Sequence, residues 1–423
     1  MRIYFSGIGG VGIGPLAEIA HDAGYDVTGS DAAESLVTKE LQQRGINVHL
    51  SQDGESLRRE HQASEIDWFV YTSALPPHHP ELLLAKDLGI RTAKRDELIA
   101  QIIKEKQLKL IAVSGTHGKT TTTGMLVWVM QRLGLATSYS IGTTLNFGPS
   151  GQYVPGSKYF IYECDEFDRN FLHFEPHLSL ITSIDHDHFD TYPTRDDYTS
   201  AFIEFLSQSD ESLIWSKDLR YLKQPDIEAT YESYDELMEL SHIKLAGQHN
   251  RQNAFLVQKA MEKILNENDH PTTGIAEAIN SFPGTNRRFE KLGHNLYSDY
   301  GHHPVEIAAT LQMAREISDS VVLVYQPHQN IRQHEIADLY TNELFADASQ
   351  IYWLPTYLSR EDPELEVLSP QQLTRKLSQE TVSLAEMDNE LWQNIERHRQ
   401  SGHLVLGMGA GSIDNWMRSQ IET

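Results

Sequence analysis

Residues 110–122 read LIAVSGTHGKTTT, and this stretch decides the fold. A short apolar run predicts a buried strand, and the glycines after it allow backbone N–H groups to close around phosphate oxygens at the start of a helix. A lysine can then contact terminal phosphates, and the following threonine can offer a hydroxyl to Mg²⁺. The loop is shorter than the usual Walker spacing, but the strand, turn, lysine and helix together predict an ATP site rather than a ligand-free turn. Its predicted contacts are Gly115, Thr116, His117, Gly118, Lys119, Thr120 and Thr121.

Two acidic segments follow expected strands further along the chain. Residues 163–168 read ECDEFD after a strand at 159–163, and residues 185–190 read DHDHFD after a strand at 178–184. Clustered carboxylates repel one another unless cations or hydrogen bonds offset their charge. Mg²⁺ prefers carboxylates together with substrate phosphates, which favours a Mg²⁺ site over a solvated loop. The alternating histidines also permit zinc, although zinc sites usually draw ligands from separated elements and the chain has a single cysteine.

The first turn of the chain has the pattern of a diphosphate site. Residues 7–12 read GIGGVG between an expected strand at 3–8 and an expected helix at 16–23, and Asp31 follows a strand at 27–29. This is the spacing of a dinucleotide-binding βαβ unit. The motif alone does not distinguish NAD from another diphosphate, or a bound turn from a ligand-free one. An NAD-dependent oxidoreductase would explain this turn but not the second nucleotide site.

The C-terminal part carries two further clusters. Residues 247–253 read GQHNRQN at the start of a helix, where amide side chains could read an adenine edge or cap the helix. Residues 299–304 read DYGHHP near Arg287 and Arg288, which favours a catalytic role over helix capping alone. Expected strands at 321–325, 350–354 and 404–406 alternate with helices. We predict an α/β protein of three domains, which are a Rossmann-like domain at 1–105, a P-loop domain with a mainly parallel sheet at 106–288, and a Rossmann-like domain at 289–423.

Composition narrows the class of protein. The 423 residues carry a formal net charge of −25, which disfavours nucleic acids and anionic membranes as partners, although local backbone donors still permit a small phosphorylated ligand. No stretch approaches the roughly 18 apolar residues of a membrane helix, and the N-terminus lacks the apolar core of a signal peptide. The lone Cys164 excludes an internal disulfide. Together these features predict a cytoplasmic protein, and we expect a monomer or a homodimer.

Taken in order, the motifs resemble those of the Mur ligases, which build the peptide of the bacterial cell wall. The resemblance extends from Phe5 to about Trp416 and implies an enzyme that uses ATP to convert a carboxylate into an acyl phosphate, which an amine then attacks. His117 is typical of the branch that takes free UDP-N-acetylmuramate. The resemblance rests on residues 7–12, Ser30, Asp31, 72–74, 115–122, 163–168, 187–188, His249, Asn250, Asn253, 284–285, 287–288, 299–304, 326–328 and 409–411.

The resemblance also implies roles for the site residues. The first domain would hold UDP rather than NAD, the second would hold ATP, and the third would hold the incoming amino acid. Substrate contacts would come from Gly9, Gly10, Val11, Gly12, Ser30, Asp31, Ser73, Asp165, Glu166, Tyr300 and His302. ATP contacts would come from the loop together with Asn250, Asn253 and Asp299. Thr120 and Glu163 would bind one Mg²⁺, and His188 a second. The catalytic groups would be Lys119, His188, Arg288, His302 and Arg332.

The chain departs from the family pattern at three places, and the first of them bears on the acceptor. Residues 329–332 read QNIR where the family has Arg-Tyr-Thr-Arg, so Gln329 replaces an arginine expected beside the substrate carboxylate. Ser183 stands at a usual asparagine, and the segment between Lys217 and Gly247 is short.

Two acceptors and one non-catalytic alternative stay open at this point. The acceptor is L-alanine or, as in a sister branch that recycles cell-wall peptide, the tripeptide L-alanyl-γ-D-glutamyl-meso-diaminopimelate. Residues 300–303 and 171–173 favour L-alanine, whereas residues 121–124 with Trp128 suit the tripeptide. A regulatory protein that binds nucleotides without catalysis would be expected to lose the lysine or the Mg²⁺ ligands, and both are intact.

Overall fold

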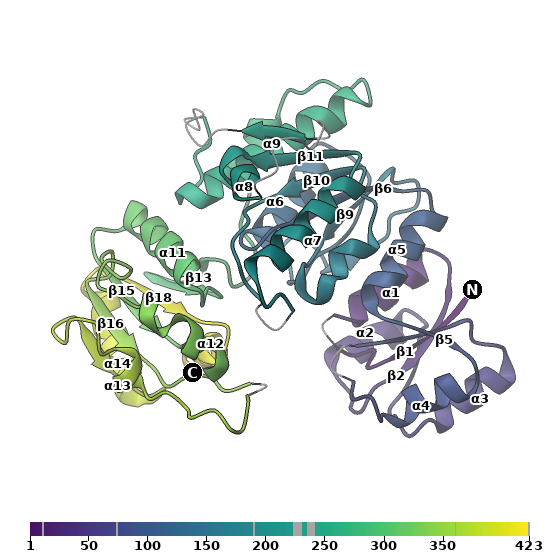
Figure 1. Ribbon diagram of the computed structural model, residues 1–423, viewed down its shortest axis with the longest axis horizontal. Coiled ribbons are helices and arrows are strands. Elements are labelled where there is room, and N and C mark those ends of the chain that lie inside the picture. Colours follow the sequence, from purple (N-terminus) through teal and green to yellow (C-terminus); the bar gives the residue numbers. More distant parts are fainter. Residues whose placement is uncertain are drawn as a thin grey trace. The chain divides into compact units, whose positions relative to one another are not determined.

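The computed structural model describes residues 1–10, 12–72, 75–188, 191–222, 231–234, 242–359 and 361–421. The chain forms two compact units, which are Met1–Glu239 with Ala254–Phe282, and Leu240–Asn253 with Pro283–Thr423. The first unit holds two sheets and the second holds one, and all three are mostly parallel (Figure 1). This confirms the predicted α/β class. None of the helices in these ranges is both long and apolar enough to cross a membrane.

The N-terminal sheet is entirely parallel, with the strand order β3-β2-β1-β4-β5. The expected first strand at 3–8 is two residues too long at its end, because Gly7 has φ +77° and turns the chain after Ser6. The strands are β1 (Arg2–Ser6), β2 (Asp26–Ser30), β3 (Asn47–His49), β4 (Trp68–Tyr71) and β5 (Arg91–Ala93). The helices are α1 (Gly14–Asp22), α2 (Leu36–Gln43), α3 (Glu55–Ala63), α4 (Pro80–Asp87) and α5 (Arg95–Glu105).

The central sheet has the order β12-β11-β10-β6-β9-β7-β8 and is parallel except for β8. Its core strand β6 is buried along its length after Lys109, as its apolar sequence predicts. The strands are β6 (Lys109–Ser114), β7 (Thr137–Ser140), β8 (Gly151–Gln152), β9 (Tyr159–Glu163), β10 (Leu178–Ile181), β11 (Glu211–Trp215) and β12 (Tyr231–Tyr234). The helices are α6 (Lys119–Arg132), η1 (Phe167–His173), α7 (Arg195–Gln208), α8 (Ser216–Tyr221), α9 (Gln248–Asn266) and α10 (Ile275–Asn280).

The C-terminal sheet has the order β13-β14-β18-β15-β16-β17, with β13 antiparallel to β14 and the others parallel. One face is packed by a buried aromatic cluster in which the rings of Tyr325 and Trp353 lie 5.0 Å apart. The strands are β13 (Glu290–Gly293), β14 (Leu296–Asp299), β15 (Val321–Tyr325), β16 (Gln350–Trp353), β17 (Val382–Leu384) and β18 (Leu404–Met408). The helices are α11 (Pro304–Ile317), α12 (Asn330–Ile336), η2 (Ala337–Leu339), α13 (Pro370–Leu373), α14 (Asn389–Gln400) and α15 (Ile413–Ile421).

Sheet topology explains why distant motifs meet. In the central sheet β6 lies between β10 and β9, so the ATP loop, the acidic segment after β9 and His188 after β10 all follow neighbouring parallel strands. Side chains at the carboxyl ends of such strands gather at one edge of the sheet. The first turn follows β1 in the same way, between β2 and β4.

Candidate active site

The predicted ATP loop connects β6 to α6. Gly115 has φ +128° and Gly118 has φ +90°, which are conformations that residues with a Cβ rarely adopt. A Cβ atom on Gly115 would also lie 2.5 Å from Oγ1 of Thr182. Gly118 is the N-cap of α6, so the loop ends at the amino terminus of a 14-residue helix. Both glycines are therefore required by the backbone geometry, and the helix dipole favours an anion at this loop.

Lys119 reaches back across the loop toward carboxylates. Its Nζ atom lies 2.8 Å from Oε2 of Glu166 and 3.7 Å from Oδ1 of Asp165, and it donates to the carbonyl of Gly115 at 2.7 Å. Burial alone would lower the pKa of Lys119, but the carboxylates of Glu166 and Asp165 outweigh it and raise that pKa. The side chain is therefore a fixed positive charge at the mouth of the loop.

Thr120 and Glu163 meet, as the proposed metal site requires. Thr120 donates its hydroxyl to Oε1 of Glu163 at 2.6 Å, and the backbone N–H of Gly142 donates to Oε2 at 2.7 Å. Both carboxylate oxygens of Glu163 thus accept a hydrogen bond at the end of β9, directly beside the start of α6. A hydroxyl and a carboxylate at this distance form an oxygen donor set of the kind that Mg²⁺ prefers.

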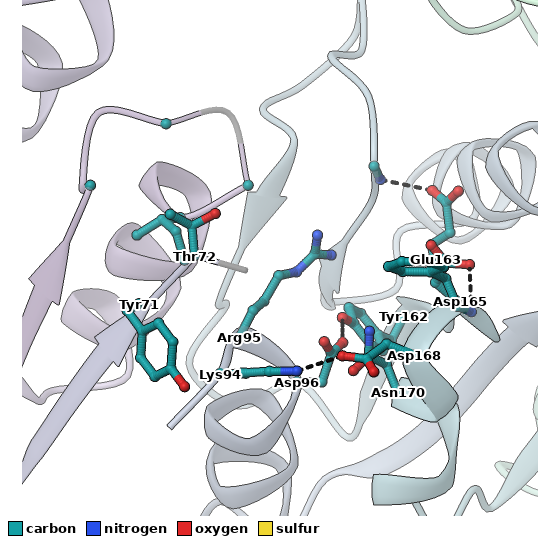
Figure 2. Close-up of a pocket in the computed structure, with 16 residues that line it drawn as sticks. Tyr71, Thr72, Lys94, Arg95, Asp96, Tyr162, Glu163, Asp165, Asp168 and Asn170 are labelled. Carbon is teal, nitrogen blue, oxygen red and sulfur yellow. Dashed lines mark hydrogen bonds and ion pairs between the residues drawn. The ribbon is translucent and has the colours of Figure 1, made fainter. Parts of the chain in front are cut away.

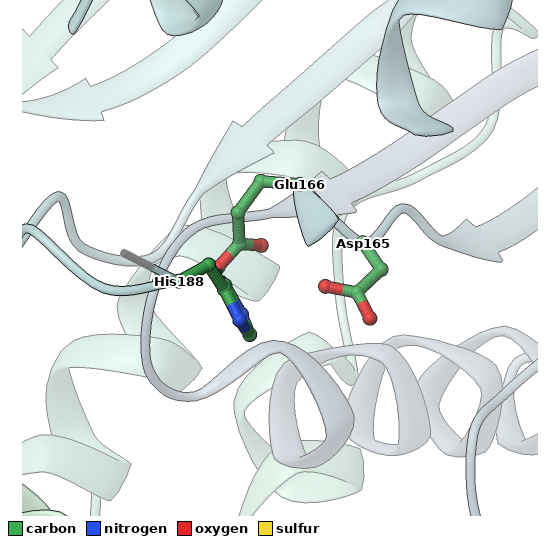
Figure 3. A group of neighbouring side chains, drawn as sticks. All are labelled: Asp165, Glu166 and His188. Atoms are coloured by element: carbon green, nitrogen blue, oxygen red, sulfur yellow. Dashed lines mark ion pairs between the residues drawn. The ribbon is translucent and has the colours of Figure 1, made fainter. Parts of the chain in front are cut away.

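A second group of possible ligands lies beside Lys119. One ligand atom each of Asp165, Glu166 and His188 falls within 4.8 Å of the others (Figure 3). Nε2 of His188 is 3.6 Å from Oε1 of Glu166, whose side chain is fully buried. Burial raises the pKa of Glu166 despite the opposing charge of Lys119, whereas Lys119 and His188 outweigh burial at Asp165 and lower its pKa. Within the described ranges this is the single group of three side chains with metal-binding geometry.

Asp187 and His186, in the described part of the DHDHFD segment, contact the backbone. Oδ1 of Asp187 accepts the N–H of His188 at 2.8 Å, and Nε2 of His186 lies 2.9 Å from the carbonyl of Tyr192. His188 itself has φ +56°. Asp190 lies outside the described residues. Among the described residues, only His188 of this segment joins a metal-binding group, which gives no support to a zinc site built from the segment alone.

Ser183, one of the departures from the family pattern, supports the ATP loop. Its carbonyl accepts the N–H of Thr116 at 2.9 Å, and its hydroxyl accepts the N–H of His117 at 3.0 Å. The shorter side chain therefore still anchors the loop to the end of β10.

The first turn, at residues 7–12, is hydrogen-bonded to the carboxylate of Asp31. Gly9 donates its N–H to Oδ2 of Asp31 at 2.8 Å, and Gly7 and Ile8 donate theirs to the carbonyl of Ser30. A Cβ atom on Gly9 would lie 2.9 Å from that Asp31 oxygen. Asp31 therefore holds the turn in shape from the end of β2. Val11 and Ser73, which were predicted as substrate contacts, lie outside the described residues.

The Ser30 hydroxyl, another predicted substrate contact, is directed into the interior. Ser30 is fully buried and donates to Oε2 of Glu81 at 2.7 Å, and Ser6 donates to the same oxygen at 2.6 Å. Tyr4 donates to Oε1 of Glu81 at 2.9 Å. Glu81, on α4, is fully buried and thus joins the ends of β1 and β2 beneath the turn.

Replacing Glu81 by leucine is expected to lower the free energy of unfolding by about 2–4 kcal/mol, because three buried hydroxyls lose their acceptor. Chemical denaturation measures this change. Glu34→Leu is the matched control, since the Glu34 side chain is 54% exposed and pairs with the exposed Lys39; its cost should stay below about 1 kcal/mol. Equal stability of the wild-type and Glu81→Leu proteins would contradict this role.

A cavity of about 390 Å³ connects the first turn to the acidic strand end within the first unit (Figure 2). Gly7, Gly10 and Gly12 line it on one side, and Glu163 and Asp165 line it on another. Its wall also contains residues that the sequence did not single out: Tyr71, Lys94, Arg95, Asp96, Tyr162 and Asn170. The predicted diphosphate turn and the predicted Mg²⁺ ligand therefore face one cavity.

The predicted adenine contacts lie in the second unit. Asn250 donates to the carbonyl of Ala246 at 3.0 Å, which fixes its amide within the first turn of α9. Asn253 is buried. Arg251 holds the start of α9 against α11 through a bidentate pair with Glu316 at 2.8 and 2.9 Å. Asn250 thus satisfies a backbone carbonyl, and both interpretations of the GQHNRQN segment stay predictions.

Asp299 fixes the backbone on both sides of β14, where the DYGHHP segment begins. Its two carboxylate oxygens accept the N–H groups of Phe289 at 2.8 Å and Gly301 at 2.7 Å. Burial raises its pKa, and the charge of Arg288 opposes that rise. The Arg288 guanidinium lies 5.3 Å from the ring centroid of Tyr300 and 3.8 Å from a Glu306 oxygen. Asp299, Tyr300 and Arg288 are therefore brought together at the end of β14.

His302 and Arg332 also meet, on the same side of the C-terminal sheet. A nitrogen of the Arg332 guanidinium contacts Nε2 of His302, and the His302 ring lies 5.5 Å from the ring of His328. Burial lowers the pKa of His302 to about 4, so the ring is neutral at pH 7. Gln329, the replaced arginine, has φ +60° and donates its N–H to the carbonyl of Tyr357. Arg332 is therefore the guanidinium of the QNIR segment that reaches this cluster.

Three mostly parallel sheets with a phosphate loop at the centre define a nucleotide-binding α/β enzyme. Residues 2–107 match the catalytic domain of the Mur ligase family, and residues 113–235 match the Mur ligase middle domain. The chain belongs to the Mur ligase family and is an ATP-dependent ligase, which confirms the resemblance found in the sequence.

Relatives and solved structures narrow the comparison. UDP-N-acetylmuramate–L-alanine ligases from Fusobacterium nucleatum and Carboxydothermus hydrogenoformans are each 31% identical to this chain, over 97% and 98% of it and 94% and 95% of their own lengths. The crystal structure of the UDP-N-acetylmuramate–alanine ligase from Thermotoga maritima has a TM-score of 0.74 at 23% identity, covering 100% of this chain and 98% of that one. A murein peptide ligase from Psychrobacter arcticus has a TM-score of 0.64 at 20% identity, with 100% and 98% covered. The two structures support the fold.

Proposed function

We propose that this chain joins L-alanine to the carboxylate of UDP-N-acetylmuramate at the expense of ATP, in peptidoglycan synthesis. The observation that carries the proposal is the shared cavity, in which the first turn faces Glu163 beside the ATP loop. A sugar acid held by its UDP group at the turn could extend its carboxylate toward the terminal phosphate of ATP. Relatives of this name align with the chain over nearly its whole length.

In this mechanism the ATP loop and its neighbours stabilise charge that develops during phosphoryl transfer. The substrate carboxylate attacks the γ-phosphate, ADP leaves, and the acyl phosphate that results accepts the amine of alanine with loss of phosphate. Lys119, already charged and held by Glu166, neutralises oxygens of the transferred group. Asp165 lies on both the cavity wall and the Lys119 cluster, and with Glu166 it would fix the position of that lysine.

Two Mg²⁺ positions fit the residues present. The Thr120 hydroxyl and the Glu163 carboxylate would hold one ion, and the buried Glu166 with His188 and Asp165 offers donors for a second. The ions would neutralise phosphate charge. The repulsion between the carboxylates of this segment gives a physical reason for cations here.

The C-terminal unit would bind the acceptor amino acid, and it would provide some of the residues that contact the nucleotide. Tyr300, His302 and Arg332 form a cluster suited to the carboxylate of an amino acid, and Arg332 is the positive charge in contact with the neutral His302. We assign Asn250, Asn253 and Asp299 to the nucleotide and Arg288 to a phosphate. We expect domain boundaries near residues 105 and 288, a cytoplasmic location, and a monomer or homodimer, which light scattering would distinguish.

Phosphate release with ATP, Mg²⁺ and UDP-N-acetylmuramate tests the reaction, with L-alanine, glycine, L-serine and the tripeptide supplied in parallel. We expect L-alanine to give the highest kcat/KM, by about tenfold or more over glycine, because one methyl group in a closed apolar pocket is worth roughly 10- to 200-fold. The tripeptide is the second candidate acceptor, since Gln329 removes one arginine that would flank a single amino acid's carboxylate. Preference for the tripeptide would reassign the acceptor, and no phosphate release with any acceptor would refute the proposal.

A further inference from the structure

One charged side chain in the wall of the shared cavity has no role in the mechanism above. Arg95 is the first residue of α5, and it lines the cavity together with Gly12 and Glu163 (Figure 2). Its Nε atom is buried and has no hydrogen-bond partner among the described residues. The guanidinium carbon lies 5.4 Å from the ring centroid of Tyr162, which supports the plane of the group without satisfying its donors. A buried donor without an acceptor is costly, so its presence indicates a missing ligand.

The residues on either side of Arg95 differ from it, because their side chains have hydrogen-bond or ion-pair partners. Lys94 lines the same cavity, but its Nζ atom is 2.5 Å from Oδ2 of Asp168. Asp96, the next residue, accepts the hydroxyl of Tyr162. Both flanking charges therefore have hydrogen-bonding partners within the protein, whereas the side chain of Arg95 extends away from both of them (Figure 2).

The position of the first turn identifies the chemistry of the ligand. A Cβ atom placed on Gly12 would lie 3.9 Å from Nη1 of Arg95, so the guanidinium is in contact range of the turn. The N–H groups of Gly7, Ile8, Gly9 and Gly10 already donate to Ser30, Asp31 and Gly7, so an anion at this turn needs side-chain donors as well. An anion seated on the turn would meet the planar fork of an arginine, which suits paired phosphate oxygens better than a lysine does.

We propose that Arg95 binds the diphosphate of the UDP-linked substrate and holds it against the first turn. This inference rests on the proposed function, because it takes the UDP-sugar as the ligand of that turn. It also adds a binding residue from α5 to a site otherwise formed by the loop after β1 and the end of β2. The residue that holds the diphosphate would therefore lie on α5, the helix before β6, and β6 ends at the ATP loop.

Calorimetric binding of UDP, UMP, UDP-N-acetylglucosamine and UDP-N-acetylmuramate tests this role, with the wild-type chain and with Arg95→Ala, Arg95→Lys and Lys94→Gln. We expect Arg95→Ala to weaken UDP binding by roughly 10- to 100-fold and UMP binding less, with Arg95→Lys in between. Lys94→Gln is the matched control, and it should bind UDP within about threefold of wild type because Lys94 is already paired with Asp168. Binding of ATP with Mg²⁺ should change by less than about twofold in Arg95→Ala, which shows that the variant is folded.

Three results would overturn the inference, and each is distinct. UDP binding by Arg95→Ala and Arg95→Lys at wild-type affinity would remove the residue from the site. An effect on UDP-N-acetylmuramate without an effect on UDP-N-acetylglucosamine would show that Arg95 holds the sugar's carboxylate instead. Failure of the wild-type chain to bind UDP at all would refute the proposed function itself, and with it this inference.

Discussion

Replacing Lys119 by methionine is expected to lower the rate of ATP-dependent ligation by about 10³-fold. The ammonium group lies within the loop, 2.7 Å from the carbonyl of Gly115, where it would meet the terminal phosphates. Phosphoryl transfer depends mainly on positioning and on neutralising charge, so loss of this cation removes stabilisation of the transition state. Phosphate release at saturating substrates measures the effect, while binding of the UDP-sugar should survive.

The same substitution is also expected to destabilise the fold, and a double variant can separate this loss of stability from the loss of activity. Glu166 is fully buried and loses its partner at 2.8 Å, and breaking a buried pair costs about 3–5 kcal/mol. The double variant Lys119→Met/Glu166→Gln replaces the unpaired carboxylate by a neutral amide and should recover most of the stability without recovering activity. Lys109→Ala is the matched control at the opposite end of β6, where Lys109 pairs with Glu267. Substantial ligation by the double variant would contradict the role of Lys119.

The ATP loop and the acidic strand end could be predicted because their signals are local. Strand, turn and helix are contiguous between residues 109 and 132, and the turn glycines Gly115 and Gly118 both have the positive φ that glycine favours. The adjacency of β10, β6 and β9 then follows from the parallel sheet and brings Glu163 and His188 to the same edge. For these residues, position in the sequence nearly determines position in the fold.

The environment of Ser30 could not be read in this way. Its hydroxyl partner, Glu81, is 51 positions further along the chain, on a helix whose buried face is set by tertiary packing. The family resemblance places Ser30 among the substrate contacts, and this stays a prediction, whereas the hydrogen bond of its hydroxyl to Glu81 could not be inferred from the sequence. Arg95 was missed for the opposite reason. It stands among charged residues at 94–97 that suggest a solvated helix start, and only the folded chain places it in a cavity wall.

Glu163→Gln is expected to raise the Mg²⁺ concentration needed for half-maximal activity by about tenfold or more, and to lower kcat at any fixed Mg²⁺. The carboxylate is positioned at both oxygens, by Thr120 at 2.6 Å and by the N–H of Gly142 at 2.7 Å. Glutamine keeps the shape but has a single acceptor oxygen, so one of these donors loses its partner and the negative charge is gone. A neutral amide is a weaker ligand for Mg²⁺ than a carboxylate.

Asp168→Asn is the control that distinguishes direct binding of Mg²⁺ by Glu163 from an effect of the segment's total negative charge. Asp168 belongs to the same segment and lines the same cavity, but its carboxylate is paired with Lys94 at 2.5 Å. If the segment acted only through its summed charge, both substitutions would shift the Mg²⁺ titration alike, because each removes one negative charge from the same wall. If Glu163 binds the ion directly, Glu163→Gln alone will shift it. An unchanged titration in Glu163→Gln would leave Thr120 without its proposed partner ligand and would move the first Mg²⁺ away from the start of α6.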